Sequence, residues 1–242
     1  MVISMKQYTS IMALAVRALL GKVLAVTAAT AAIQLAVFRL IPEQVSSLYN
    51  LQRESWTAPL AALGLTAVLV LLALHGGPLS GVRTSYTLRR LPVSEQTVTI
   101  LWAVVYLGFL LLFWAAEVGV VLLQQHWTAL LYPSQVPAFQ RFSDNYSTPF
   151  FHGLLPLYDW PRYLCNAIWL IALAWNAAAF SYQHRRGRLP GGGILVLILG
   201  LLFFVMGETT SGMVVSILFT FVMVMVTLWS FFSLREEEEG DA

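Results

Sequence analysis

Apolar runs dominate this chain, and each is about 20 residues long, the length that a helix needs to cross a hydrocarbon core of about 30 Å. Polar, proline- or glycine-containing segments separate the runs. Within a run, apolar and polar residues do not alternate at every second position, as they do in membrane-barrel strands. The pattern therefore predicts an all-α polytopic membrane protein with six transmembrane helices. The predicted spans are residues 23–41, 57–75, 97–123, 162–182, 189–207 and 212–232.

The segment before the first span has a different pattern. In residues 1–22, Lys6, Arg17 and Lys22 are interspersed with apolar residues at helical spacing. This predicts an amphipathic helix in the membrane interface, with its cations near lipid phosphates. A signal peptide is the alternative, although Arg17 and Lys22 interrupt its apolar core. The spans then make up one transmembrane domain, residues 23–234.

Composition agrees with a membrane protein. Hydrophobic residues make up 58% of the 242 residues and charged residues only 11%, whereas an ordinary soluble domain has about 25% charged residues. The single cysteine, Cys165, excludes an internal disulfide. No feature of the sequence predicts a nucleic-acid partner.

A compact basic loop, residues 76–96, lies between the second and third predicted spans. It contains Arg83, Arg89 and Arg90, with no acidic residue before Glu95, and glycines and a proline end the apolar run that precedes it. Such a loop is suited to binding a partner at the membrane surface.

The middle of this loop is expected to be helical. Residues 84–91 are long enough for two turns of an amphipathic helix, with Tyr86 and Leu88 as its apolar contacts. Ser94 then precedes a helical pattern, so we expect its hydroxyl to cap the third span. A short cytoplasmic helix between spans two and three is predicted.

Positive charges set the orientation, because loops rich in Lys and Arg stay on the cytoplasmic side. That side holds both termini, including an acidic tail at residues 235–242, and the basic loop. The long segment of residues 124–161 is then an outer loop. The cations on the cytoplasmic side are Lys6, Arg17, Lys22, Arg83, Arg89, Arg90, Arg185, Arg186, Arg188 and Arg235.

No catalytic motif is present in the sequence. A Walker A loop needs glycines and a lysine around the phosphates, and neither of the two lysines lies in such a motif. The four histidines lack metal-ligand spacing, so no metal site is predicted. Ser211 lies in a turn with a weak similarity to the serine turn of rhomboid-type proteases, but no histidine follows it.

Glu117 is the one carboxylate deep inside a predicted span. An ionised acid there costs about 2.5 kcal/mol or more, so it should be protonated, paired or next to a wet cavity. Two interpretations are open: Glu117 lines a substrate path, or it locks helices together by a hydrogen bond to an amide such as Gln34 or Asn176.

The order of these features resembles the ABC-2 type permeases of bacterial ABC transporters: an amphipathic start, two spans, a basic loop and four further spans. The most specific part is residues 83–95, which read R-T-S-Y-T-L-R-R-L-P-V-S-E and look like a coupling helix leading into the third span. The chain departs from the family in one respect. Members often carry re-entrant outer helices between spans five and six, where this chain has only residues 207–212.

The resemblance implies a transport subunit in the bacterial plasma membrane, usually for export. ATP and Mg²⁺ would bind to a separate ATPase subunit, with no cofactor in this chain, and a second permease chain, identical or different, would complete the path in the lipid. The residues expected to contact the ATPase are Arg83, Tyr86, Leu88, Arg89 and Arg90. The alternatives are a non-catalytic membrane scaffold or immunity protein and, less favoured, an intramembrane hydrolase using Ser211.

Overall fold

The computed structural model describes residues 5–40, 56–75, 94–131, 146, 149–186, 191–206 and 212–240. These residues form helices and short turns, and none of them lies in a β-strand. The predicted all-α class is confirmed. The helices are α1 (Met5–Arg39), α3 (Thr57–Ala73), α5 (Glu95–Leu131), α7 (Pro149–Leu154), α8 (Trp160–Arg185), α9 (Gly191–Met206) and α10 (Gly212–Gly240).

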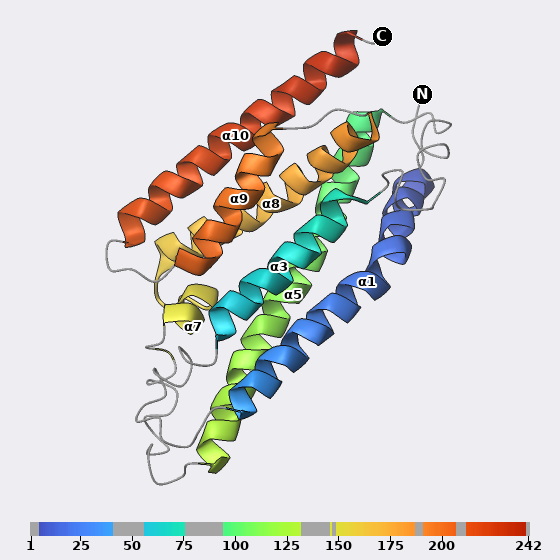
Figure 1. Cartoon of the computed structure of the whole chain (residues 1–242). Helices are drawn as coiled ribbons and strands as arrows, with labels where there is room; N and C mark the ends of the chain where they lie inside the picture. Colours follow the sequence, from blue (N-terminus) through green and yellow to red (C-terminus); the bar gives the residue numbers. More distant parts are fainter. Residues whose placement is uncertain are drawn as a thin grey trace.

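Apart from the short α7, the described helices lie side by side in one bundle (Figure 1). Successive helices of the bundle run in opposite directions, so the start of α1 and the end of α10 lie at the same end (Figure 1). Helices α1, α3 and α5 pack against one another, as do α8, α9 and α10, and α5 packs along α8 to join the two groups.

Four of the described helices are long and apolar enough to cross a membrane: Gln7–Arg39, Glu95–Leu130, Trp160–Arg185 and Val214–Ser233. Helices α3 and α9 are apolar but shorter, with 17 and 16 residues. At a rise of 1.5 Å per residue, the 17 residues of α3 span about 25 Å. The architecture is compatible with a membrane-embedded protein, and the six-span arrangement stays a prediction.

Helix α1 differs from the expected division at residue 22. It is one continuous helix of 35 residues, where an interfacial helix and a separate span were expected. The reason is a buried stripe at four-residue spacing, Ile11, Ala15, Leu19 and Val23, which packs into the main core on both sides of that boundary. The first turns of α1 therefore share the core of the bundle.

Two other helices extend beyond their predicted ends. Helix α5 continues from the predicted end at residue 123 to Leu131, into the segment expected to be an outer loop. Helix α10 continues to Gly240 and includes most of the acidic tail. Thr128 illustrates the first extension, because its hydroxyl donates to the carbonyl oxygen of Gln124 at 2.8 Å within the added turns.

Close helix contacts occur where a glycine faces a neighbouring side chain. A Cβ atom at Gly64 of α3 would lie 2.5 Å from both Cγ2 and Oγ1 of Thr30 on α1. A Cβ atom at Gly200 of α9 would lie 2.5 Å from Leu173 Cδ2, and the carbonyl oxygen of Gly200 accepts a 3.1 Å hydrogen bond from Trp169 Nε1. Small residues at these positions let the helices approach closely.

Candidate functional site

The structure describes both ends of the basic loop but not residues 76–93 between them. Arg83, Tyr86, Leu88, Arg89 and Arg90, the residues expected to contact a partner, therefore lie outside the described residues. The loop begins after His75, which follows the end of α3, and it ends at Ser94, which precedes α5. These two flanks define where the loop is attached.

The predicted cap at the exit of the loop is present. The backbone N–H of Thr97 donates to Ser94 Oγ at 3.2 Å, and the N–H of Val98 donates to the Ser94 carbonyl oxygen at 3.2 Å. Glu95 lies in the first turn of α5, where a negative charge is favoured by the helix dipole. The start of α5 is thus fixed by its own sequence.

The entry of the loop is held by the last turns of α8. The hydroxyl of Ser181 donates to the carbonyl oxygen of His75. The His75 ring lies against the fully buried Trp102 of α5, with 4.9 Å between ring centroids. The guanidinium of Arg185 lies over the same Trp102 ring, 4.7 Å from its centroid. An unpaired carbonyl at a helix end needs such a donor, and α8 supplies it.

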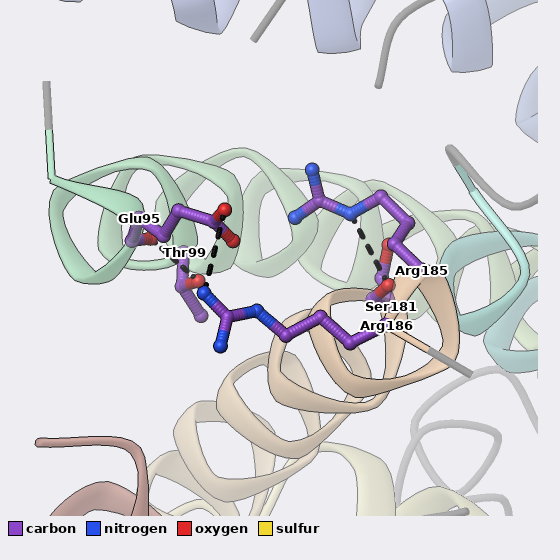
Figure 2. Close-up of polar contacts among 5 residues, drawn as sticks. All are labelled: Glu95, Thr99, Ser181, Arg185 and Arg186. Carbon is purple, nitrogen blue, oxygen red and sulfur yellow. Dashed lines mark hydrogen bonds and ion pairs between the residues drawn. The ribbon is translucent and has the colours of Figure 1, made fainter. Parts of the chain in front are cut away.

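The exit of the loop is held by the same end of α8, as Figure 2 shows. Arg186 Nη2 lies 3.7 Å from Glu95 Oε1 in a partly exposed ion pair, and Arg185 Nε donates to the Ser181 carbonyl oxygen at 3.3 Å (Figure 2). Arg186 also lies over the Tyr182 ring. We call His75, Glu95, Trp102, Ser181, Arg185 and Arg186 the loop-stem cluster.

A second polar cluster lies further along the same helices. It consists of Gln34 on α1, Thr57 at the start of α3, and Glu117 and Gln124 on α5, each at most 2% exposed. Gln34 Nε2 donates to Glu117 Oε2 at 2.9 Å and to the Thr57 carbonyl oxygen at 3.2 Å. Gln124 Nε2 donates to Thr57 Oγ1 at 3.3 Å. We call these four residues the amide–carboxylate cluster.

Two acceptors of the amide–carboxylate cluster remain unsatisfied. Within the described part of the chain, the Oε1 atoms of Gln34 and Gln124 are buried without a hydrogen-bond partner. Because unpaired polar atoms cost free energy in a low-dielectric interior, breaking the hydrogen bonds that the cluster does make would add to this cost, and these bonds therefore constrain the helices. It joins α1, α3 and α5 at one level of the bundle.

Asn176, the other amide considered as a partner of Glu117, makes different contacts. Its Nδ2 donates to the Ala172 carbonyl oxygen at 2.8 Å and to Thr227 Oγ1 at 2.9 Å. Asn176 therefore joins α8 to α10. Of the two amides named from the sequence, Gln34 is the one that contacts Glu117.

Helix α7 packs against α5 and the start of α3, away from the basic loop (Figure 1). Phe150, Phe151 and Leu154 of α7 pack with Ala61 of α3 and Val121 of α5. The Leu154 carbonyl oxygen accepts a 3.0 Å hydrogen bond from the indole nitrogen of Trp114 on α5.

His152 of α7 lies beside a cation. Burial lowers the pKa of His152, and the nearby Arg162, whose Nη1 lies 3.2 Å from His152 Nδ1, lowers it further against an opposing effect of Asp159. His152 is therefore neutral near pH 7. In the part of the chain that the structure describes, no three His, Cys, Asp or Glu side chains come close enough to hold a metal ion.

The loop-stem cluster was not predicted from the sequence. Arg185 and Arg186 were used only to predict the orientation in the membrane, and no role was predicted for Trp102 or Ser181. Two features of the sequence are nevertheless consistent with such a cluster. Trp102 and Tyr106 lie one helical turn apart near the start of the third predicted span, and Arg185 and Arg186 follow the end of the fourth. Pairing these segments, however, requires the helix arrangement.

Comparison of the chain with known protein families, with curated proteins and with solved structures finds no match.

Proposed function

We propose that this chain is the transmembrane permease subunit of an ABC transporter of the ABC-2 type, an exporter in the bacterial plasma membrane. Its six apolar helices cross the membrane, both termini are cytoplasmic, and a separate ATPase subunit supplies ATP hydrolysis. A second permease chain pairs with it to complete the path. The sequence of the chain contains no catalytic motif.

One observation carries this proposal: a basic loop connects two apolar helices, and both of its ends are attached to the end of a third helix. Ser181 and Arg186 of α8 contact His75 and Glu95, which flank the loop. A partner that pushes on a loop whose two ends contact a third helix acts on that helix as well as on the loop. A coupling segment needs this property.

The loop sequence suits a protein partner. Tyr86 and Leu88 provide apolar anchors, and Arg83, Arg89 and Arg90 provide charges that can meet acidic groups on an ATPase. Interfaces of this kind concentrate binding energy in a few aromatic and arginine residues, where truncation costs about 2 kcal/mol or more. Residues 83–95 also resemble the coupling segment of the ABC-2 family.

The decisive experiment reverses the charge of the loop. The protein is purified in mild detergent from its native membrane, and copurifying proteins are identified by mass spectrometry. We expect an ATPase with the wild-type chain, and we expect Arg89→Glu/Arg90→Glu to lose the ATPase or its stimulation. Arg53→Glu/Arg141→Glu makes the same charge change on the predicted outer side and should keep both.

Three results count against the proposal. They are wild-type assembly and stimulation in the Arg89→Glu/Arg90→Glu variant, absence of any ATPase from the wild-type preparation, and labelling from outside intact cells of a cysteine placed at residues 84–91. Absence of an ATPase would favour the membrane scaffold or immunity protein, which needs none.

A further inference from the structure

We infer that movement of the basic loop is transmitted to the last turns of α8. Ser181, Arg185 and Arg186 are the positioning residues that attach both stems of the loop to α8. The entry stem is the end of α3 with His75, and the exit stem is the start of α5 with Glu95. This inference rests on the function proposed above for residues 76–93. Force on the loop would then act directly on α8 as well as on α3 and α5, the two helices that the loop connects.

The entry stem is attached through buried contacts. His75 is 5% exposed and Ser181 is fully buried, and the Ser181 hydroxyl donates to the His75 carbonyl oxygen. Arg185 and His75 both lie against the ring of the buried Trp102. The entry stem therefore cannot move away from α8 without breaking the buried hydrogen bond between Ser181 and His75.

The exit stem is attached through a more exposed contact. The side chains of Arg186 and Glu95, which form the ion pair, are 25% and 38% exposed. Water can replace such a contact at small cost. The exit stem can therefore separate from α8 and return while the hydrogen bond between Ser181 and His75 stays closed.

Helix α8 is placed to pass this movement on. Trp169 donates to the Gly200 carbonyl oxygen of α9, and Asn176 donates to Thr227 of α10. Helices α9 and α10 are thereby connected through α8 to the basic loop, although the loop is distant from them in the sequence. Coupling of this kind needs a continuous series of packed and hydrogen-bonded contacts.

A charge-swap cycle tests the exit contact. We expect Arg186→Glu and Glu95→Arg each to keep the copurifying ATPase but to lower its stimulation by the permease up to about fivefold, which corresponds to about 1 kcal/mol for an exposed pair. The double variant Glu95→Arg/Arg186→Glu restores the pair and should recover stimulation. Arg162→Glu, at the opposite end of α8, is the matched control and should leave stimulation unchanged.

A second measurement does not depend on the ATPase. Cysteines replacing Glu95 and Arg186 are joined with a short bifunctional thiol reagent, in a chain whose only natural cysteine, Cys165, is buried. We expect efficient crosslinking in the purified chain and loss of ATPase stimulation when the crosslink forms, with the partner still bound. A cysteine pair at residues 95 and 162 should not crosslink.

The outcomes separate the two proposals. If an ATPase copurifies with the wild-type chain and Arg186→Glu keeps full stimulation, the role of α8 is overturned while the proposed function stands. The role of α8 is also overturned if the double variant is no better than the single variants, or if residues 95 and 186 fail to crosslink. If no ATPase copurifies, the proposed function fails, and force transfer through α8 fails with it.

Discussion

The two polar clusters lie toward opposite ends of α3 and differ in chemistry. The amide–carboxylate cluster at Thr57 is buried, with each member at most 2% exposed, and its contacts are hydrogen bonds among uncharged amides, a hydroxyl and one carboxyl group. The loop-stem cluster at His75 combines a buried hydrogen bond from Ser181 with arginines, aromatic rings and a partly exposed ion pair. About 25 Å of helix separates them, given the 17 residues of α3.

This difference indicates different mechanical roles for the two ends. A buried set of hydrogen bonds can open only by leaving polar atoms unpaired in an apolar interior, so the amide–carboxylate cluster fixes α1, α3 and α5 relative to one another. The ion pair of the loop-stem cluster can exchange its contact for water. The amide–carboxylate end is therefore fixed, whereas at the loop-stem end the contact between Glu95 and Arg186 can open while the buried hydrogen bond from Ser181 to His75 stays closed.

The largest effect should come from the close helix contact beside the fixed end. Gly64→Ala places a methyl group 2.5 Å from Thr30 Cγ2 and Oγ1, and overpacking of this kind costs about 1–3 kcal/mol. We expect a lower melting temperature of the detergent-solubilised chain and partial recovery in Gly64→Ala/Thr30→Ala. Gly108→Ala is the control, because nothing lies within 4 Å of its added Cβ. An equal loss in both single variants would refute the packing explanation.

The next effect concerns the hydrogen bond between Gln34 and Glu117. Gln34→Leu removes the donor that lies 2.9 Å from Glu117 Oε2. Hydrogen bonds of this kind contribute about 0.6 kcal/mol on average in membranes, and a partner left unpaired costs more. We therefore expect the free energy of unfolding to fall by about 1–2 kcal/mol. Thermal unfolding in detergent measures it. Gln34→Leu/Glu117→Leu should lose less than the two single variants together.

Glu117→Gln is the matched variant for this cluster, because its amide oxygen can still accept from Gln34. We expect nearly wild-type stability. Transport by the assembled complex then separates the two interpretations of Glu117. Loss of transport with assembly intact indicates that the carboxyl group lines the substrate path, and wild-type transport indicates that it only locks helices.

The sequence was sufficient for the fold class but not for the helix boundaries. Run length and composition gave the apolar helices, because a hydrocarbon core sets their length. The cations of residues 1–22 predicted a separate interfacial helix, whereas α1 is continuous, because its buried face continues through Ile11, Ala15, Leu19 and Val23. Packing of one face outweighed the charges on the other.

The two clusters differ in how far they could be predicted from the sequence. Glu117 stood out because a carboxyl group is rare inside an apolar run, but the choice between Gln34 and Asn176 depends on which helices touch. The loop-stem cluster combines residues from α3, α5 and α8 that are far apart in the sequence, such as His75 and Ser181. No local pattern specifies that pairing.

The smallest loss of stability that we predict comes from removing one cation–π contact at either end of the bundle. Arg185 lies 4.7 Å from the centroid of Trp102, which is fully buried, whereas Arg39 lies 5.4 Å from the centroid of the half-buried Trp127. Desolvation strengthens such contacts, from about 0.5–1 kcal/mol when exposed to about 2 kcal/mol when buried. Arg185→Gln should therefore destabilise the chain by about 1 kcal/mol, and Arg39→Gln by less.

The variant Arg185→Lys sharpens this comparison. Arg185→Lys keeps the charge but loses the planar face that lies on Trp102, so its melting temperature should fall between those of wild type and Arg185→Gln. For a chain of this size, about 1 kcal/mol corresponds to about 2–4 °C, which melting curves in one detergent resolve. If Arg39→Gln lowers the melting temperature more than Arg185→Gln does, burial of the ring does not control the contact, and the loop-stem cluster owes its attachment to the Ser181 hydrogen bond instead.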